Sequence, residues 1–153
     1  KVIPAGSWSH IVCVYDQINR LVYLNADTPD TLVTNADLTS DDNDSFYIGA
    51  SPVNPFYFDG VIDQVLVYNI ALTSAQVSTI YNGGVGTQNI PTTGLIGRWE
   101  LEEGSGTTAS DTSGSGFDGT LKPTGTEPAW VDGIVEVGGF VFNPLILRTY
   151  QNS

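Results

Sequence analysis

The sequence predicts an all-β protein, a two-sheet antiparallel sandwich with one short helix. The composition includes 17 Gly and 8 Pro in 153 residues, which favours many turns, and its frequent Val, Ile, Thr and Tyr favour short strands. Several strand-like segments are apolar at both alternating sets of positions, as in strands covered on both faces. A chain of this length usually folds as one domain, so we expect residues 1–153 to form a single sandwich.

The first predicted strands form a hairpin. The apolar run Ile11–Tyr15 leads through a turn at 16–20 to a second strand, Leu21–Asn25. Cys13 lies inside the first run, so we expect its thiol to be buried and inert. Since it is the only cysteine, an internal disulfide is excluded.

The clearest strand, residues 60–68, is followed by the one predicted helix, at 74–82. Thr73 and Gln76 have the spacing of a capping box, and Gly83 suits a left-handed stop. An apolar stripe at i, i+3, i+4 spacing predicts that the helix packs on a sheet. This stripe consists of Val77, Ile80 and Tyr81.

The second part of the chain follows a predicted linker at 85–93. A strand is expected at 95–101, and the Gly-, Ser-, Thr- and Asp-rich stretch after it predicts a structured loop rather than a spacer. Short strand-like segments follow from Ala129 to the end of the chain.

The charge is strongly acidic, with 17 Asp and Glu against five Lys and Arg and a net charge of −12. Nucleic acid and anionic membrane surfaces are therefore not expected as partners, because binding to them requires clustered basic residues. No apolar span is long enough for membrane insertion. The absence of Met and the start at Lys1 indicate a processed product or an excised region.

Four segments resemble, in this order, the C-terminal half of laminin G-like modules of the concanavalin A-like superfamily: WSHIVCVYD, LVYLN, FYIGAS and FDGVIDQVLVYNIALTSAQVSTIY. A later segment resembles the N-terminal half of the same modules: GLIGRWELEEGSGTTASDTSGSGFDGTL. Ser9 and Gln64 depart from the family's usual His and Glu. The resemblance implies an antiparallel jelly-roll sandwich of concanavalin A/laminin G type.

The two halves stand in inverted order. The family's C-terminal half is expected at 1–84, the linker at 85–93, and the N-terminal half with a tail at 94–153. A circular permutant is the favoured explanation, because the combined length is about that of one module and sandwich termini often lie close together. Exchange of halves between neighbouring subunits, or a cut through tandem modules, are the alternatives.

Calcium is the expected ion, as a structural one. Asp111 and Asp118 flank a Gly-rich segment, and Ca²⁺ prefers carboxylate and carbonyl oxygens. The resemblance implies that this loop lies near the strand that contributes Gly60 and Asp63. In the competing interpretation, Asp63 caps a turn or pairs with Arg98, and Asp111 forms an Asx-turn.

A carbohydrate site would need aromatic faces with amide groups beside them. The candidates for ligand binding are Asn54, Phe56, Tyr57 and Trp130. Trp8 and Trp99 open predicted strands, and we expect both to be core residues.

Catalysis is not expected. His10 is the only histidine and lies in an alternating strand, where a packed side chain is typical. Glycosidases of this superfamily carry paired acids on one strand, and Glu100, Glu102 and Glu103 do not reproduce that arrangement.

These observations predict a non-catalytic recognition or adhesion module that binds carbohydrate or protein outside the cell. The alternative function is a structural subunit of a virion, tail fibre or extracellular filament, with neighbouring copies of the chain as partners. An accessory domain of a polysaccharide-degrading enzyme comes third. Both main hypotheses predict an extracellular or surface-exposed location, and both rest on analogy with proteins of the same fold.

Overall fold

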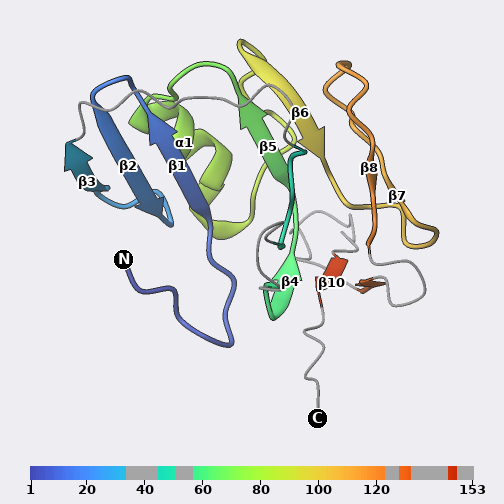
Figure 1. Ribbon diagram of the computed structural model, residues 1–153. Coiled ribbons are helices and arrows are strands. Elements are labelled where there is room, and N and C mark those ends of the chain that lie inside the picture. Colours follow the sequence, from blue (N-terminus) through green and yellow to red (C-terminus); the bar gives the residue numbers. More distant parts are fainter. Residues whose placement is uncertain (34–44, 51–56, 123–127, 132–144, 148–153) are drawn as a thin grey trace. The chain divides into compact units, whose positions relative to one another are not determined.

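The computed structural model describes residues 1–33, 45–50, 57–122, 128–131 and 145–147. The chain divides into two compact units, residues 1–40 with 68–95 and residues 41–67 with 96–153. The described elements are short strands and one α-helix with a 3-10 turn (Figure 1).

The first unit contains a three-stranded antiparallel sheet in the order β1 (Ile11–Tyr15), β2 (Asn19–Leu24), β3 (Asp30–Val33). The predicted hairpin is confirmed, with Ile11 opposite Leu24 and Tyr15 opposite Arg20. Asp16 fixes its turn, because one carboxylate oxygen accepts the N–H groups of Ile18 at 3.0 Å and Asn19 at 2.6 Å.

The two faces of this sheet differ in burial. Val14 and Tyr23 are buried on one face, and α1 lies behind β1 and β2 in Figure 1. On the other face Ile11 is 46% exposed, and Cys13 is exposed as well. The expectation of two covered faces and a buried thiol is therefore wrong here. The apolar residues that led to it lie on an open face, and sequence alternation does not distinguish the two cases.

Helix α1 (Ser74–Tyr81) has the predicted capping box. The Thr73 hydroxyl accepts the Gln76 N–H at 3.3 Å, and the Gln76 side chain accepts the Thr73 N–H at 2.9 Å. Val77 and Ile80 are buried, as the stripe predicts. The helix ends one residue early, because Asn82 adopts the left-handed conformation and opens the 3-10 turn η1 (Asn82–Gly84).

The second unit is built from short strand pairs. β4 (Gly60–Ile62), β10 (Leu145–Leu147) and β9 (Ala129–Trp130) form one sheet in that order. β7 (Thr108–Ala109) pairs with β8 (Gly119–Thr120).

The predicted strand at 60–68 is divided into β4 and β5 (Val65–Tyr68), and β5 pairs with β6 (Leu95–Trp99). The break falls at Asp63 and Gln64, where Gln64 has a φ of 49°. An extended strand cannot include this left-handed backbone.

The core of the second unit surrounds Trp99, which is buried with Leu101, Ala109 and Leu121. Trp99 is therefore a core residue, as predicted. Trp8 is not, because its side chain is 43% exposed. It lies before β1 begins at Ile11 and does not share that strand's buried face.

The described strands form four small sheets, and the expected two-layer sandwich is not seen as such. The mostly-β content with one short helix agrees with the prediction. Among the described residues, no helix is both long enough and apolar enough to cross a lipid bilayer.

Candidate functional site

The loop between β7 and β8 is organised around the Asp111 carboxylate. Oδ1 accepts the backbone N–H groups of Arg98 and Ser113, both at 2.9 Å. Oδ2 accepts the Phe117 N–H at 3.0 Å. One side chain therefore joins β6 to both ends of the Gly-rich turn. The Asx-turn of the competing interpretation is present in the bond to Ser113.

Two further bonds close this loop onto the core. Asp118 accepts the Asp111 N–H at 2.8 Å, and the Phe117 carbonyl accepts the indole N–H of Trp99 at 2.9 Å. Gly114 and Gly116 have φ values of 92° and 78°, a backbone conformation that residues other than Gly rarely adopt. The loop is thus structured, as the sequence indicated.

Asp111 stays ionised in this setting. Burial alone raises the pKa of its carboxyl group, but the hydrogen bonds from the Ser113 side chain and from the backbone N–H groups of Phe117, Arg98 and Ser113 outweigh it. Together they hold the pKa of Asp111 well below its usual range, since each bond favours the charged form.

Of the four predicted calcium ligands, Asp111 and Asp118 lie close together. Gly60 is in β4 and pairs with Leu147, and Asp63 follows β4 as a half-buried residue. No group of three or more His, Cys, Asp or Glu side chains within the described ranges is arranged to hold a metal ion. The four predicted ligands are therefore not joined into one site by the contacts of this structure.

The acidic residues after β6 bind basic and backbone groups. Glu100 pairs with the Arg98 guanidinium. One carboxylate oxygen of Glu103 accepts the Ser110 N–H at 2.6 Å, next to Asp111. Glu103 therefore helps to position the start of the same loop.

Of the predicted ligand-binding residues, Tyr57 is the best placed. It lies opposite Ala50 in an antiparallel bridge and is 44% exposed. Trp130 packs against the Trp99 core and donates its indole N–H to the Gly106 carbonyl at 2.9 Å. Its role in ligand binding stays a prediction. Asn54 and Phe56 lie outside the described residues.

Three exposed aromatic residues were not predicted from the sequence, namely Phe46, Tyr47 and Phe58. Phe46 stacks on Trp99, with ring centroids 5.7 Å apart. Phe58 donates its N–H to the Gly49 carbonyl at 2.8 Å, beside the Ala50–Tyr57 bridge. Together with Tyr57 these residues form what we call the aromatic hairpin. The runs of adjacent aromatic residues at 46–47 and 56–58 were the available signal in the sequence.

His10 is packed, as predicted. Its ring stacks on Tyr81 of α1, with centroids 5.7 Å apart. Its backbone is bonded to Asn25, which donates to the His10 carbonyl at 2.8 Å and accepts the His10 N–H at 2.9 Å. Burial lowers the pKa of His10 below its usual value.

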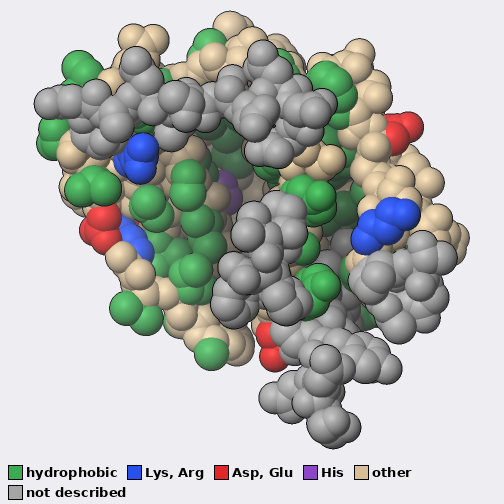
Figure 2. Space-filling model, viewed as in Figure 1, with side chains coloured by type: hydrophobic (Ala, Val, Ile, Leu, Met, Phe, Trp, Pro, Cys, Tyr) green, Lys and Arg blue, Asp and Glu red, His purple; other side chains and the backbone are tan. Residues whose placement is uncertain are grey.

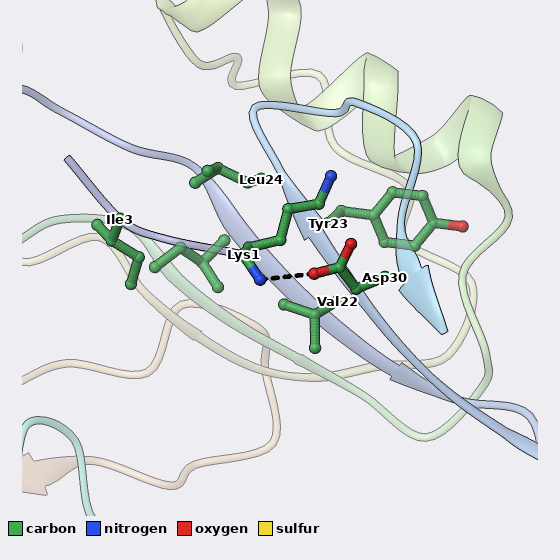
Figure 3. A pocket seen from close by; sticks show the side chains of 7 residues that line it. Lys1, Ile3, Val22, Tyr23, Leu24 and Asp30 are labelled. Atoms are coloured by element: carbon green, nitrogen blue, oxygen red, sulfur yellow. Dashed lines mark hydrogen bonds and ion pairs between the residues drawn. The ribbon is translucent and has the colours of Figure 1, made fainter. Parts of the chain in front are cut away.

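A cavity of about 250 Å³ lies beside the sheet of the first unit (Figure 3). Its lining is Lys1, Ile3, Ile11, Val22, Tyr23, Leu24 and Asp30. The N-terminal ammonium group of Lys1 contacts the Asp30 carboxylate at 2.5 Å. The lining is otherwise largely apolar.

Residues 1–78, just over half of the chain, match the family Laminin_G_3, described as the concanavalin A-like lectin/glucanases superfamily. The chain belongs to this family. Neither the curated proteins nor the solved structures contain a match.

The matched part of this concanavalin A-like protein contains the β1–β3 sheet, the aromatic hairpin, and β4, β5 and the first part of α1. The Asp111 loop lies outside the match, so the resemblance of residues 94–133 to an N-terminal half stays a prediction. The same holds for the inverted order of the halves.

Proposed function

We propose that this concanavalin A-like domain is a non-catalytic recognition module that binds carbohydrate or protein outside the cell. The aromatic hairpin is the observation that carries this proposal. It lies within the matched part of the chain and presents four exposed aromatic side chains on two neighbouring segments. Large exposed aromatic side chains on neighbouring segments are often part of binding sites.

The arrangement of the hairpin suits a flat, uncharged ligand. Phe46 is supported from below by Trp99, and the Phe58 ring lies within 3 Å of where a side chain on Gly60 would be. Rings held in this way lose little freedom when a ligand stacks on them. The net charge of −12 disfavours sulfated or carboxylated glycans, so we expect neutral sugars.

A binding screen with two variants tests the proposal. We expect the protein to bind members of a panel of neutral oligosaccharides and extracellular matrix proteins. The double variant Tyr57→Ala/Phe58→Ala should bind them at least tenfold more weakly. Phe117→Ala is the matched control, because Phe117 is also exposed but lies in the Asp111 loop. Equal binding by all variants would place the site elsewhere.

We further propose that the Asp111–Asp118 loop binds a structural calcium ion, with the Gly60 carbonyl and the Asp63 carboxylate as additional ligands. The 2.8 Å bond from the backbone N–H of Asp111 to the Asp118 carboxylate supports it, because it brings the two acidic residues close together in a Gly-rich loop.

Thermal unfolding tests the calcium proposal. We expect calcium to raise the melting temperature of the wild type and not that of Asp118→Asn, which keeps the acceptor for Asp111 but loses the charge. An identical wild-type melting temperature with excess calcium and with chelator would mean that there is no such site.

A structural assembly subunit is the second candidate, and the open apolar face of the β1–β3 sheet favours it. A third candidate, an accessory domain of a polysaccharide-degrading enzyme, has no comparable observation in its favour.

A further inference from the structure

The C-terminal end of α1 carries the only Asn–Gly pair in the sequence, Asn82–Gly83. Asn82 ends the helix in the left-handed conformation, with φ 45° and ψ 44°, and its backbone N–H donates to the Ser78 carbonyl. Its side-chain amide donates to the Gly86 carbonyl at 2.7 Å. Both residues of the pair are exposed, so water reaches them in the folded chain.

An Asn–Gly pair can lose ammonia through a cyclic imide, a reaction that needs only water as a partner. The Gly83 nitrogen gives up its proton and attacks Cγ of Asn82, so a new N–C bond forms while the Cγ–Nδ2 bond breaks. Ammonia leaves with the proton. Water then opens the imide, which gives aspartate when the bond to Cγ breaks and isoaspartate when the bond to the main-chain carbonyl carbon breaks. Glycine favours ring closure, because it has no side chain to hinder the attack.

The native conformation of Asn82 keeps the reacting atoms apart. At a ψ of 44°, the tetrahedral geometry of Cα places the Gly83 nitrogen nearly opposite to Cβ across the Cα–C bond, whereas attack on Cγ needs both on the same side. The bond from Nδ2 to the Gly86 carbonyl also holds the amide in place. Ring closure therefore requires that the helix end opens and ψ rotates. Local openings of this kind cost less free energy than global unfolding.

We propose that Asn82–Gly83 is a modification site whose conversion to aspartate or isoaspartate is controlled by opening of the C-terminal end of α1. Helix α1 lies behind β1 and β2, on the face opposite to the one where hydrophobic side chains gather in Figure 2. Its last residue, Tyr81, stacks on the His10 ring. This contact restrains the end that has to open. The proposal does not depend on the ligand or on calcium.

Conversion weakens the end of the helix. The product has lost the amide donor, so the Gly86 carbonyl loses that partner. The new carboxylate places negative charge at the C-terminal end of the helix, where the helix dipole disfavours it. In isoaspartate the main chain runs through Cβ, and this additional carbon atom displaces Gly83 from the left-handed turn. The modified chain should therefore be less stable than the original one.

Conversion rates in the folded and the unfolded chain test the control by opening. The full chain is incubated at mildly alkaline pH with and without an unfolding concentration of urea, and peptide mapping with detection of isoaspartate follows Asn82. We expect conversion in urea, and conversion at least about tenfold slower in the folded chain. Asn25 is the matched control within the same chain, since it is also left-handed, with φ 53°, but precedes Ala26. In urea it should convert much more slowly than Asn82.

Two substitutions at position 82 test the consequence for the helix. Asn82→Asp has the charge of the product and should lower the melting temperature. Asn82→Gly keeps a residue that adopts the left-handed conformation and cannot form the imide. After incubation in urea and refolding, the wild type should melt at a lower temperature than before, and Asn82→Gly should lose less.

Equal conversion rates with and without urea would overturn the proposal, because the helix end would then exert no control. An unfolded chain without product at Asn82 would overturn it as well, since the pair would not be a modification site. If Asn82→Asp is as stable as the wild type, the predicted weakening of α1 is wrong.

Discussion

Single side chains with several backbone partners determine much of the local structure. Asp111 accepts three backbone N–H groups from two segments, and Asp16 accepts two in the β1–β2 turn. The pKa of each carboxyl group is held below its usual value. The sequence predicted that Asp111 belongs to a structured loop. It could not show that β6 supplies one of the donors, because that contact joins residues 13 positions apart.

His10 should make the stability depend on pH. Burial lowers its pKa in the folded state, so the unfolded state binds more protons below the ordinary value of 6.5. The free energy of unfolding should therefore fall as the pH falls through 6.5, and level off below the folded pKa. Urea denaturation at pH 7.5 and pH 5.5 measures this loss.

His10→Phe is the control for this titration, because it keeps an aromatic ring to stack on Tyr81 and removes the titrating group. The difference between the wild type and His10→Phe should shrink or reverse as the pH falls. A difference that stays constant between the two pH values would contradict the assignment.

Gly97 should tolerate no side chain. A Cβ atom at this position would lie 2.6 Å from the Trp99 ring, whereas one at Gly119 would meet only ordinary contacts at 3.5 Å. Gly97→Ala should displace Trp99, lower the free energy of unfolding by roughly 1–3 kcal/mol and shift the tryptophan fluorescence. Gly119→Ala is the matched control and should change both much less. Equal effects of the two substitutions would contradict the packing around Trp99.

For helices and strands, the sequence predicted where the elements begin and end better than it predicted which of their faces are buried. The hairpin and the capped helix follow from turn residues and cap spacing, which act within a few positions. The open face of β1 was predicted to be covered, because Ile11 and Cys13 are as apolar as their buried neighbours. Whether a second layer covers an apolar face depends on segments distant in sequence, and alternation carries no information about them.

The capping box of α1 should contribute measurably to stability. Thr73→Ala removes the side-chain acceptor for the Gln76 N–H and should cost about 1 kcal/mol of stability. Thr79→Ala is the matched control, because the Thr79 hydroxyl only bonds back to the Ala75 carbonyl inside the helix, and its loss should be near neutral. Chemical denaturation measures both. A larger loss for Thr79→Ala than for Thr73→Ala would contradict the capping role.

At the scale of the whole molecule, membership of the concanavalin A-like family rests on residues 1–78. The predicted sandwich and the inverted order of its halves concern the pairing of residues 1–84 with 94–153. The order of the halves was inferred from local resemblance, but whether they pair into one sandwich depends on contacts between distant segments, which local pattern does not reveal. The acidic charge disfavours polyanionic partners on electrostatic grounds that do not depend on how the two units are arranged, and this stays a prediction.

We propose that the aromatic hairpin is the recognition surface of this concanavalin A-like protein. Nuclear magnetic resonance titration of the folded chain with soluble neutral oligosaccharides tests this proposal. We expect saturable shifts of the aromatic signals of Phe46, Tyr47, Tyr57 and Phe58. No shift with any oligosaccharide, or shifts confined to the loop between Asp111 and Asp118, would contradict it.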